Sequence, residues 1–229
     1  MKILGIDTST AIGSIGLIDE GGIIAEQTLS ISRQHASRLI PAIDQTLKSA
    51  ELKIRDIDAV AVAIGPGSFT GVRIAVSTAK TICYAIERPV IGISTLESIA
   101  YNLAYIPSEI CVILDARKDE VYSAVFKNGV RQSNDRCLTI SAILSEITPP
   151  AIFVGNGLRQ HAAEIKSHFK LDLADSICLA DSIFGLSRGT SVARLGLNRL
   201  TNSSVDDPFD IKPNYIRAGV SPPKLPIKK

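Results

Sequence analysis

Blocks of apolar and polar positions predict an α/β protein in which the second half repeats the order of the first. In the first half, apolar residues at helical spacing predict an amphipathic helix at 34–50, with a face made of Ala36, Leu39, Ile40, Ile43 and Leu47. Ser94-Thr95 followed by Glu97 predicts the capped start of a further helix. The other elements expected here are strands at 2–7, 13–19, 23–29, 59–64 and 90–93 and a helix at 70–86.

The second half restarts with an apolar strand at 110–114 that ends in Asp115, as the first strand of the chain ends in Asp7. Asn128-Gly129 is typical of a tight hairpin turn. The remaining elements expected are strands at 121–126, 130–138 and 151–154 and helices at 140–147, 158–168 and 185–200. The order of strands, helix, strand and helix therefore occurs twice, which indicates duplication of a fold unit.

This repetition predicts an organisation in two lobes. We expect residues 1–104 to form the first lobe and residues 105–215 the second. Residues 216–229 carry prolines and lysines and predict a mobile, basic tail.

Composition narrows the function classes. The chain has 229 residues, with 25 lysines and arginines against 23 aspartates and glutamates, for a net charge of +2. Such a balance gives no broad field for nucleic acid, so RNA contact is expected through a partner or a local patch of Arg33, Arg38 and Arg73. Four scattered cysteines predict reduced, buried thiols, and no apolar run approaches the roughly 20 residues of a membrane span. We therefore expect a cytoplasmic, soluble protein.

A glycine turn at residues 65–71 follows the apolar run at 59–64. Its glycines and proline predict a rigid connection into a helix, where backbone N–H groups allow an anion or another backbone to approach closely. The helix that follows contains small residues such as Ala75 and Ala79 among apolar ones. One face must cover the sheet, and the rest suits either a helix of another subunit or a neighbouring helix of the same chain.

Two carboxylates suggest a nucleotide site between the lobes. Asp7 and Asp115 would face each other across a cleft and hold a hydrated Mg²⁺ beside phosphates. Ser9 and Thr10 would add donors on one side, and the turn with Gly155 and Gly157 would admit a nucleotide on the other. An acid at the end of a strand is, however, more often a turn residue.

Other common sites are excluded by spacing. No Gly-Lys-Ser/Thr follows the glycine turn, so it is not a P-loop. His35, His161 and His168 lack a second ligand one helical turn away, and Leu39 occupies that position after His35. We expect no metal site and no catalytic residue in this chain.

Five segments carry a resemblance to a known family: residues 3–10 (ILGIDTST), 34–41 (QHASRLIP), 65–74 (GPGSFTGVRI), 115–122 (DARKDEVY) and 213–217 (PNYIR). At these residues the chain resembles the TsaB (YeaZ) family, the bacterial partners in making threonylcarbamoyladenosine on tRNA. The resemblance spans nearly the whole length. It implies the two-lobed actin/hexokinase-like fold and a non-catalytic role.

The resemblance also implies partners. Family members pair with TsaD, the subunit that transfers the threonylcarbamoyl group to the tRNA adenosine next to the anticodon, and the ATPase TsaE joins the assembly. TsaD holds a metal through histidines on a helix, whereas the matching region here offers only His35. ATP and Mg²⁺ are used by the assembled complex, and we expect this chain to bind no cofactor itself and to reach tRNA only through the complex.

Pairing is implied to use the helices at 34–50 and 70–86, and the same surface forms a homodimer when TsaD is absent. The interface residues expected are His35, Leu39, Ile43, Leu47, Thr70, Arg73, Ile74, Ser77 and Thr78. The shared fold accounts for older names of glycoprotease type, and nothing in the residues supports peptidase chemistry. The alternative that the residues leave open is an independent ATPase of the actin-like fold, using Asp7, Asp115, Gly155 and Gly157.

Overall fold

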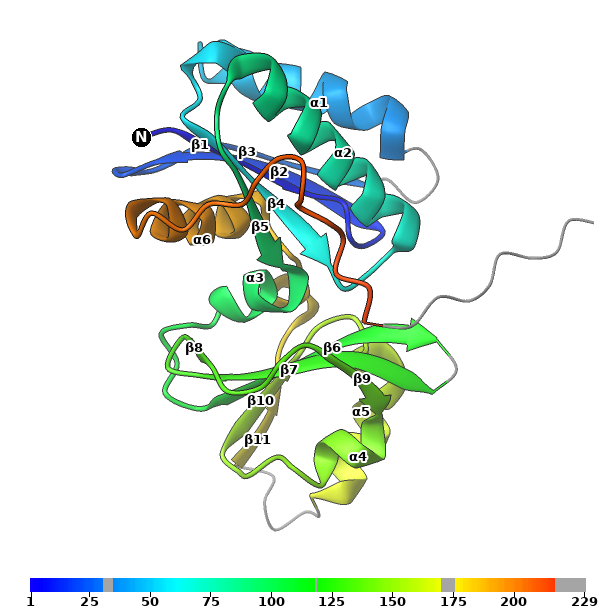
Figure 1. Cartoon of the computed structure of the whole chain (residues 1–229). Coiled ribbons are helices and arrows are strands. Elements are labelled where there is room, and N and C mark those ends of the chain that lie inside the picture. The colour runs from blue at the N-terminus through cyan, green and yellow to red at the C-terminus, as the bar shows by residue number, and fades with distance from the viewer. Residues whose placement is uncertain (31–34, 118, 170–175, 217–229) are drawn as a thin grey trace, which may run out of the picture.

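The chain forms two α/β lobes, one above the other in Figure 1. The computed structural model describes residues 1–30, 35–117, 119–169 and 176–216. The predicted tail at 216–229 lies outside this part except for its first residue. In the described residues no helix has both the length and the hydropathy to cross a bilayer.

The first lobe is built on a sheet of order β3-β2-β1-β4-β5. Strands β1, β2 and β3 pair antiparallel, and β1, β4 and β5 pair parallel. Their bounds are β1 Ile3–Asp7, β2 Ile12–Asp19, β3 Gly22–Ser30, β4 Ala59–Gly65 and β5 Val90–Ser94. All five strands expected in this half are confirmed.

The second lobe has a sheet of order β11-β10-β6-β7-β8, with β9 also paired to β7. An antiparallel hairpin again adjoins parallel neighbours, so the predicted duplication of the fold unit is confirmed. The turn Asn128-Gly129 has φ values of 51° and 72°, as a tight hairpin requires. The strands are β6 Glu109–Arg117, β7 Glu120–Lys127, β8 Val130–Arg131, β9 Arg136–Thr139, β10 Ala151–Val154 and β11 Ile177–Leu179.

Some boundaries in this lobe were predicted wrongly. Strand β6 continues through Asp115 to Arg117 because β7 pairs with it along that length, so Asp115 lies within the strand rather than at its end. The segment at 130–138 divides into β8 and β9, and β11 was not expected. The predicted helix at 140–147 is the shorter α4, Ile140–Leu144, which begins at the Thr139 cap.

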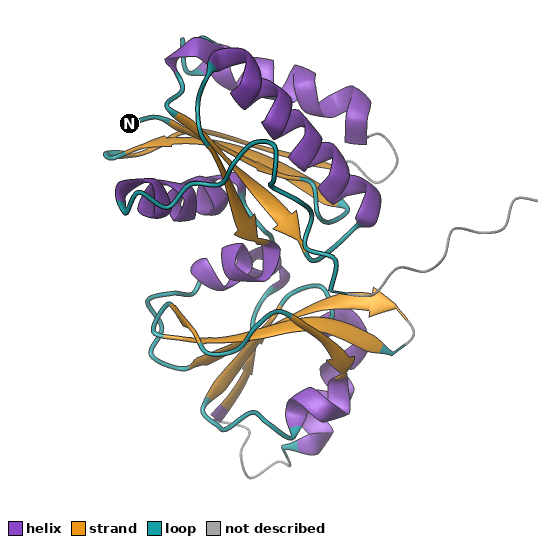
Figure 2. Cartoon of the chain, viewed as in Figure 1, coloured by secondary structure: helices purple, strands orange, loops and turns teal. Residues whose placement is uncertain are grey.

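Helices cover both faces of the first sheet (Figures 1 and 2). Helices α1, His35–Ser49, and α2, Phe69–Ile86, pack on one face through a core that includes Leu39, Ile43 and Val72. Helix α6, Gly189–Thr201, packs on the other face. In the second lobe, α4 and α5, Leu158–His168, share a core with Phe153.

The two lobes exchange helices across the predicted division at residue 104. Helix α6 belongs to the layers of the first lobe, although it follows the strands of the second. Glycines allow this close packing, since a Cβ at Gly5 would lie 2.0 Å from Gly189 O and one at Gly16 would lie 2.1 Å from Thr190 N. Conversely α3, Thr95–Tyr101, packs its Leu96 and Ile99 against the second sheet.

Residues 205–216, here called the C-terminal strap, also return to the first lobe. Asp206 bridges Val90 on the edge strand β5, and Asn214 N donates to Ile64 O at 2.7 Å. Between these ends Ile211 is buried in the core beneath α2. The strap thereby covers an edge of the sheet that would otherwise expose unpaired backbone groups.

Candidate functional site

Asp7, at the end of β1, is fully buried. Its Oδ1 accepts hydrogen bonds from Ser9 N at 2.6 Å and Ser9 Oγ at 2.8 Å, and its Oδ2 accepts one from Ser187 Oγ. Ser187 is in turn hydrogen-bonded to Ser98 of α3 at 2.9 Å. Both carboxylate oxygens are therefore engaged by the chain itself, at the point where the segment before α6 crosses between the lobes.

Burial raises the pKa of the Asp7 carboxyl from 3.8 to about 6. The hydrogen bonds from Ser187 and Ser9 favour the ionised form but offset only part of the cost of desolvation. The prediction that Asp7 lies open in a cleft is wrong for this structure. A hydrated Mg²⁺ needs accessible oxygens, so the residues present do not fit a magnesium–nucleotide complex at Asp7.

The glycine turn packs against the residues that follow Asp7. A Cβ at Gly67 would lie 2.3 Å from Ser9 O, and one at Gly71 would lie 1.9 Å from Thr8 O. Ser68 N donates to Ser9 O at 2.6 Å. Of the two interpretations of this turn, the structure therefore supports the close approach of another backbone. The Ser68 hydroxyl caps α2 by accepting from Gly71 N.

The other glycine turn is likewise filled by the chain. Gly155 has a φ of +118°, and a Cβ there would lie 2.2 Å from Ile113 O on β6. Gly157 N donates to the same oxygen at 3.1 Å, and a Cβ at Gly185 would lie 3.0 Å from Gly155. These contacts account for the glycines by packing alone.

The residues predicted for a nucleotide site thus fall into separate groups of contacts. Asp7 and Ser9 are bonded to each other, while Thr10 is partly exposed and its Oγ1 donates to Ile12 O at 2.8 Å. Asp115 is exposed, and its backbone N donates to Asn156 Oδ1 at 2.9 Å, beside Gly155 and Gly157.

The predicted partner surface on α1 also needs correction. The side chains of Leu39, Ile43 and Leu47 are 2%, 4% and 5% exposed, because they pack into the core between α1, α2 and the sheet. In this structure these three side chains therefore belong to the core and not to the exposed surface of α1. Ile40, expected on the buried face, is 54% exposed. The side chain of His35 lies outside the described part of the structure, as does Arg33.

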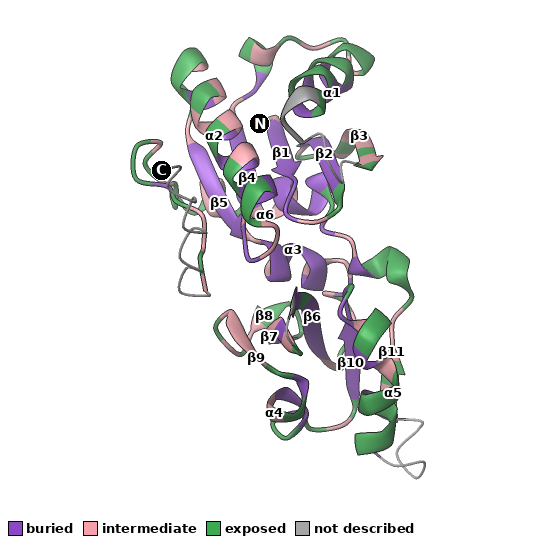
Figure 3. Ribbon diagram, turned by 90° about the vertical axis from the view of Figure 1, so that its right-hand side faces the viewer, coloured by how far each residue is buried: buried purple, intermediate pink, exposed green. Residues whose placement is uncertain are grey.

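One face of helix α2 points away from the core, toward the outside of the first lobe. Thr70, Arg73 and Ser77 are exposed, and Ile74 and Thr78 are partly exposed. Figure 3 shows that α2 carries exposed and partly exposed stretches. Part of the surface predicted for a partner is instead covered within the chain, since α1 lies beside α2.

Sequence reasoning missed an aromatic strip along this face. Phe69 and Tyr84 on α2 are exposed and meet residues of the C-terminal strap: the Phe69 and Tyr215 rings lie 5.3 Å apart, and those of Tyr84 and Phe209 lie 6.2 Å apart. Arg73 Nε donates to Tyr215 Oη at 2.9 Å, and its guanidinium lies 4.3 Å from the centre of the Phe69 ring. The pairing joins residues far apart in the chain, so no local pattern could have predicted it.

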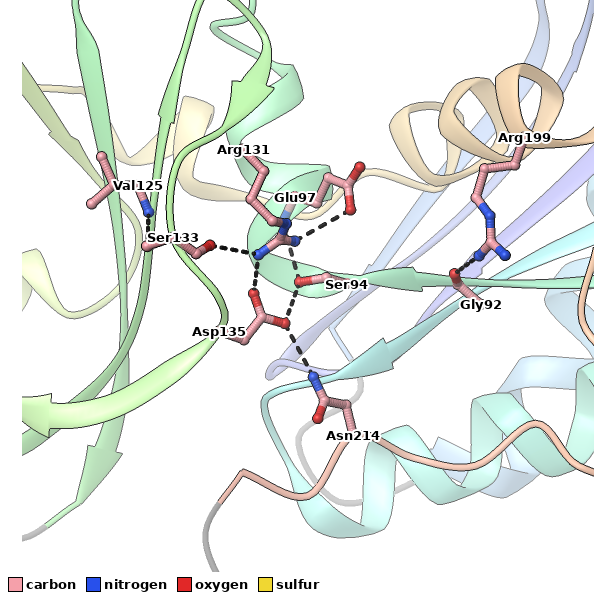
Figure 4. Close-up of polar contacts among 9 residues, drawn as sticks. All are labelled: Gly92, Ser94, Glu97, Val125, Arg131, Ser133, Asp135, Arg199 and Asn214. Atoms are coloured by element: carbon pink, nitrogen blue, oxygen red, sulfur yellow. Dashed lines mark hydrogen bonds and ion pairs between the residues drawn. The ribbon is translucent and has the colours of Figure 1, made fainter. Parts of the chain in front are cut away.

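Sequence reasoning also missed a polar cluster between the lobes, formed by Ser94, Glu97, Arg131, Asp135 and Asn214 (Figure 4). The Asp135 side chain is 8% exposed and forms an ion pair with Arg131. It also accepts from Ser94 Oγ at 2.8 Å and from Asn214 Nδ2 at 3.1 Å. Ser94 caps α3 as predicted, but the Glu97 carboxylate pairs with Arg131 at 3.2 Å. The cluster ties the strap and both lobes together.

A metal site requires several ligating side chains that lie close together. Among the described residues, no group of three or more His, Cys, Asp or Glu side chains could hold a metal ion. His161 is buried with Nδ1 3.6 Å from the Glu164 carboxylate, and His168 is exposed. The expectation of buried cysteines holds for Cys83 and Cys111 and is wrong for the exposed Cys178.

The two lobes with repeated sheets and exchanged helices define a protein of the actin/hexokinase-like class. The activator of 2-hydroxyisocaproyl-CoA dehydratase from Clostridium difficile, solved with bound ADPNP, shares this fold at a TM-score of 0.53 and 14% identity, over 90% of this chain and 99% of that one. YeaZ from Pseudomonas aeruginosa is more similar, with a TM-score of 0.77 and 25% identity over 93% of this chain and 99% of that one.

Sequence comparisons give the family. The family model described as "TsaD: tRNA N6-adenosine threonylcarbamoyltransferase" matches residues 17–163. The "tRNA threonylcarbamoyladenosine biosynthesis protein TsaB" of Bacillus subtilis is 34% identical over 72% of this chain and 76% of that protein. The Escherichia coli protein of the same name is 36% identical over 57% of this chain and 58% of that protein. The chain belongs to the TsaB (YeaZ) family.

Proposed function

We propose that this chain is a non-catalytic subunit that pairs with TsaD and thereby supports threonylcarbamoylation of the tRNA adenosine next to the anticodon. The names of its relatives place them in the biosynthesis of this nucleoside. The observation that carries the non-catalytic part of the proposal is the closure around Asp7. Ser9 and Ser187 donate hydrogen bonds to the Asp7 carboxylate, which an ATPase of the actin-like fold would instead need to direct toward magnesium.

The glycine turns support the same assignment. In each turn the backbone of the chain fills the space beside the glycines, at Thr8 and Ser9 in one lobe and at Ile113 in the other. ATP and Mg²⁺ are then used by the assembled complex and not by this chain alone. With a net charge of +2, the chain contributes little to the electrostatic attraction of tRNA, which is reached through the complex in the cytoplasm.

The outward face of α2 is the proposed site of pairing. This face has three exposed residues, Thr70, Arg73 and Ser77, and two partly exposed ones, Ile74 and Thr78. The same face would pair two copies of the chain into a homodimer when TsaD is absent. One P. aeruginosa structure carries an older name of peptidase type, with similarity to "peptidase YEAZ". A peptidase of this kind needs a nucleophile next to a base, and the hydrogen bonds of Asp7, of the glycine turns and of the polar cluster provide no such pair.

The proposal is tested by reconstituting tRNA modification. Cognate TsaD, TsaE, the carbamoyl-adenylate-forming enzyme, threonine, bicarbonate and ATP are combined with tRNA, with and without this chain. Modification is expected to collapse when the chain is omitted. Modification at an unchanged rate without it would contradict the proposed role, whatever the family.

An independent ATPase is the second candidate, favoured by the fold shared with a structure that holds ADPNP. Titration of the lone chain with ATP·Mg²⁺ separates the two. Tight binding that is lost in Asp7→Ala would favour the ATPase, whereas the closure around Asp7 leads us to expect no saturable binding.

A further inference from the structure

A trough of about 400 Å³ runs between α2 and the C-terminal strap. Figure 1 shows the strap in orange and red, passing over the first lobe toward the junction with the second. From α2 the trough is lined by Arg73, Val76, Ser77 and Lys80, and from the strap by Ile211, Lys212, Pro213 and Tyr215. The α2 residues recur at helical spacing on one face, so the strap extends the proposed pairing surface beyond the helix.

The strap is held in place at both ends and in the middle. Gly92 N donates to Asp206 Oδ2 at 2.7 Å, and Asn214 is bonded to Ile64 and to Asp135. In between, Lys80 Nζ donates to Phe209 O at 3.2 Å. A wall fixed in this way is preformed, so a partner would not bear the entropic cost of ordering it.

The trough is lined by apolar side chains and by cationic ones. Val76, Ile211 and Pro213 supply apolar surface, while Arg73, Lys80 and Lys212 are the charged groups that line it. The aromatic strip lies alongside. Aromatic rings together with arginine are typical of the residues that dominate protein–protein binding energies.

The charges discriminate between occupants. A second copy of the trough is a poor occupant, because two linings that each carry Arg73, Lys80 and Lys212 would repel each other. RNA offers phosphates to the cationic groups but no apolar side chains to match Val76, Ile211 and Pro213. A protein segment with apolar side chains and carboxylates can contact both the apolar and the cationic side chains that line the trough.

We propose that the trough between α2 and the strap binds a carboxylate-bearing, partly apolar segment of a different protein, and that Lys212 takes part in selecting it. This inference rests on the proposed function, in which that protein is TsaD.

The test uses charge reversal of matched, exposed lysines. Lys212→Glu lies in the trough, and Lys166→Glu on α5 of the second lobe is the control. Binding of each full-length variant to cognate TsaD is measured by calorimetry at about 50 mM and about 500 mM salt, since screening weakens exposed ion pairs. Self-association of each variant is measured by sedimentation.

We expect Lys212→Glu to bind TsaD roughly tenfold more weakly at low salt, with a smaller difference at high salt, and Lys166→Glu to match the wild type. Self-association of Lys212→Glu should not weaken. Equal affinity of Lys212→Glu and wild type for TsaD would overturn the inference alone. A loss of self-association equal to the loss of TsaD binding would assign the trough to a second copy and also overturn it. Failure of the wild type to bind TsaD would instead overturn the proposed function, and the inference with it.

Discussion

Replacing Asp7 by asparagine tests whether this carboxylate serves the fold or a ligand. The amide keeps an oxygen for the two hydrogen bonds from Ser9 and places an NH₂ group toward Ser187, whose hydroxyl can accept. The substitution removes the negative charge from a fully buried position at almost constant shape. If Asp7 is structural, the variant should be more stable than the wild type at neutral pH.

The magnitude follows from the pKa of Asp7. Folding raises it from 3.8 to about 6, a shift that corresponds to about 3 kcal/mol of unfolding free energy. The folded state binds the proton more tightly, so this contribution to stability is full below the unfolded pKa and is lost as the pH rises through about 6. Rearranging one hydrogen bond costs about 1 kcal/mol, which leaves a gain of about 2 kcal/mol for Asp7→Asn near neutral pH.

Urea denaturation between about pH 4 and pH 8 measures this effect, because the free energy of unfolding is obtained at each pH from the midpoint and slope. The advantage of Asp7→Asn over the wild type should grow from pH 4 to pH 6 and then level off. Asp210→Asn, at an exposed position of the strap, is the control and should show no such growth. The structural interpretation of Asp7 would be refuted by an Asp7→Asn variant less stable than wild type at pH 8, or by a difference that does not change with pH.

Further substitutions test the packing. Gly71→Ala places a Cβ 1.9 Å from Thr8 O and should lower the unfolding free energy by about 3 kcal/mol or more in urea denaturation; a loss under 1 kcal/mol would contradict the close approach. Ile43→Asp should prevent folding as judged by circular dichroism, while Ile40→Asp, on the exposed face of α1, should change stability by about 0.5 kcal/mol at most. Asp135→Ala removes the acceptor shared by the strap and both lobes and should cost about 2 kcal/mol in thermal or urea unfolding; full stability would show that the polar cluster does not tie them together.

Local patterns in the sequence predicted most elements but not how the lobes are assembled. The predicted bounds of α1 and α2 are correct to within about one residue. Each helix buries one face against the sheet, and this one-sided burial leaves a helical spacing of apolar residues in the sequence. The return of α6 to the first sheet depends on space beside Gly5 and Gly16, which precede the contacting residues Gly189 and Thr190 by 184 and 174 positions. The sequence around a glycine in a strand does not indicate which distant segment of backbone will pack against it.

The candidate site shows the same limit. Asp7 was correctly singled out as a carboxylate at a strand end, but its partner Ser187 follows it by 180 residues, and their contact decides whether the carboxylate is open or closed. The outward face of α2 was predicted in part. Its aromatic strip was not, since Phe209 and Tyr215 reach α2 only after the chain has crossed both lobes.

The central claim, that this chain supports TsaD without using a nucleotide site of its own, is tested most directly in the reconstituted modification reaction with the Asp7→Asn chain in place of the wild type. We expect modification at the wild-type rate with Asp7→Asn and collapse of modification when the chain is left out. Loss of modification with an Asp7→Asn chain that is folded and still pairs with TsaD would contradict it, because the carboxylate would then serve the reaction and not only the fold.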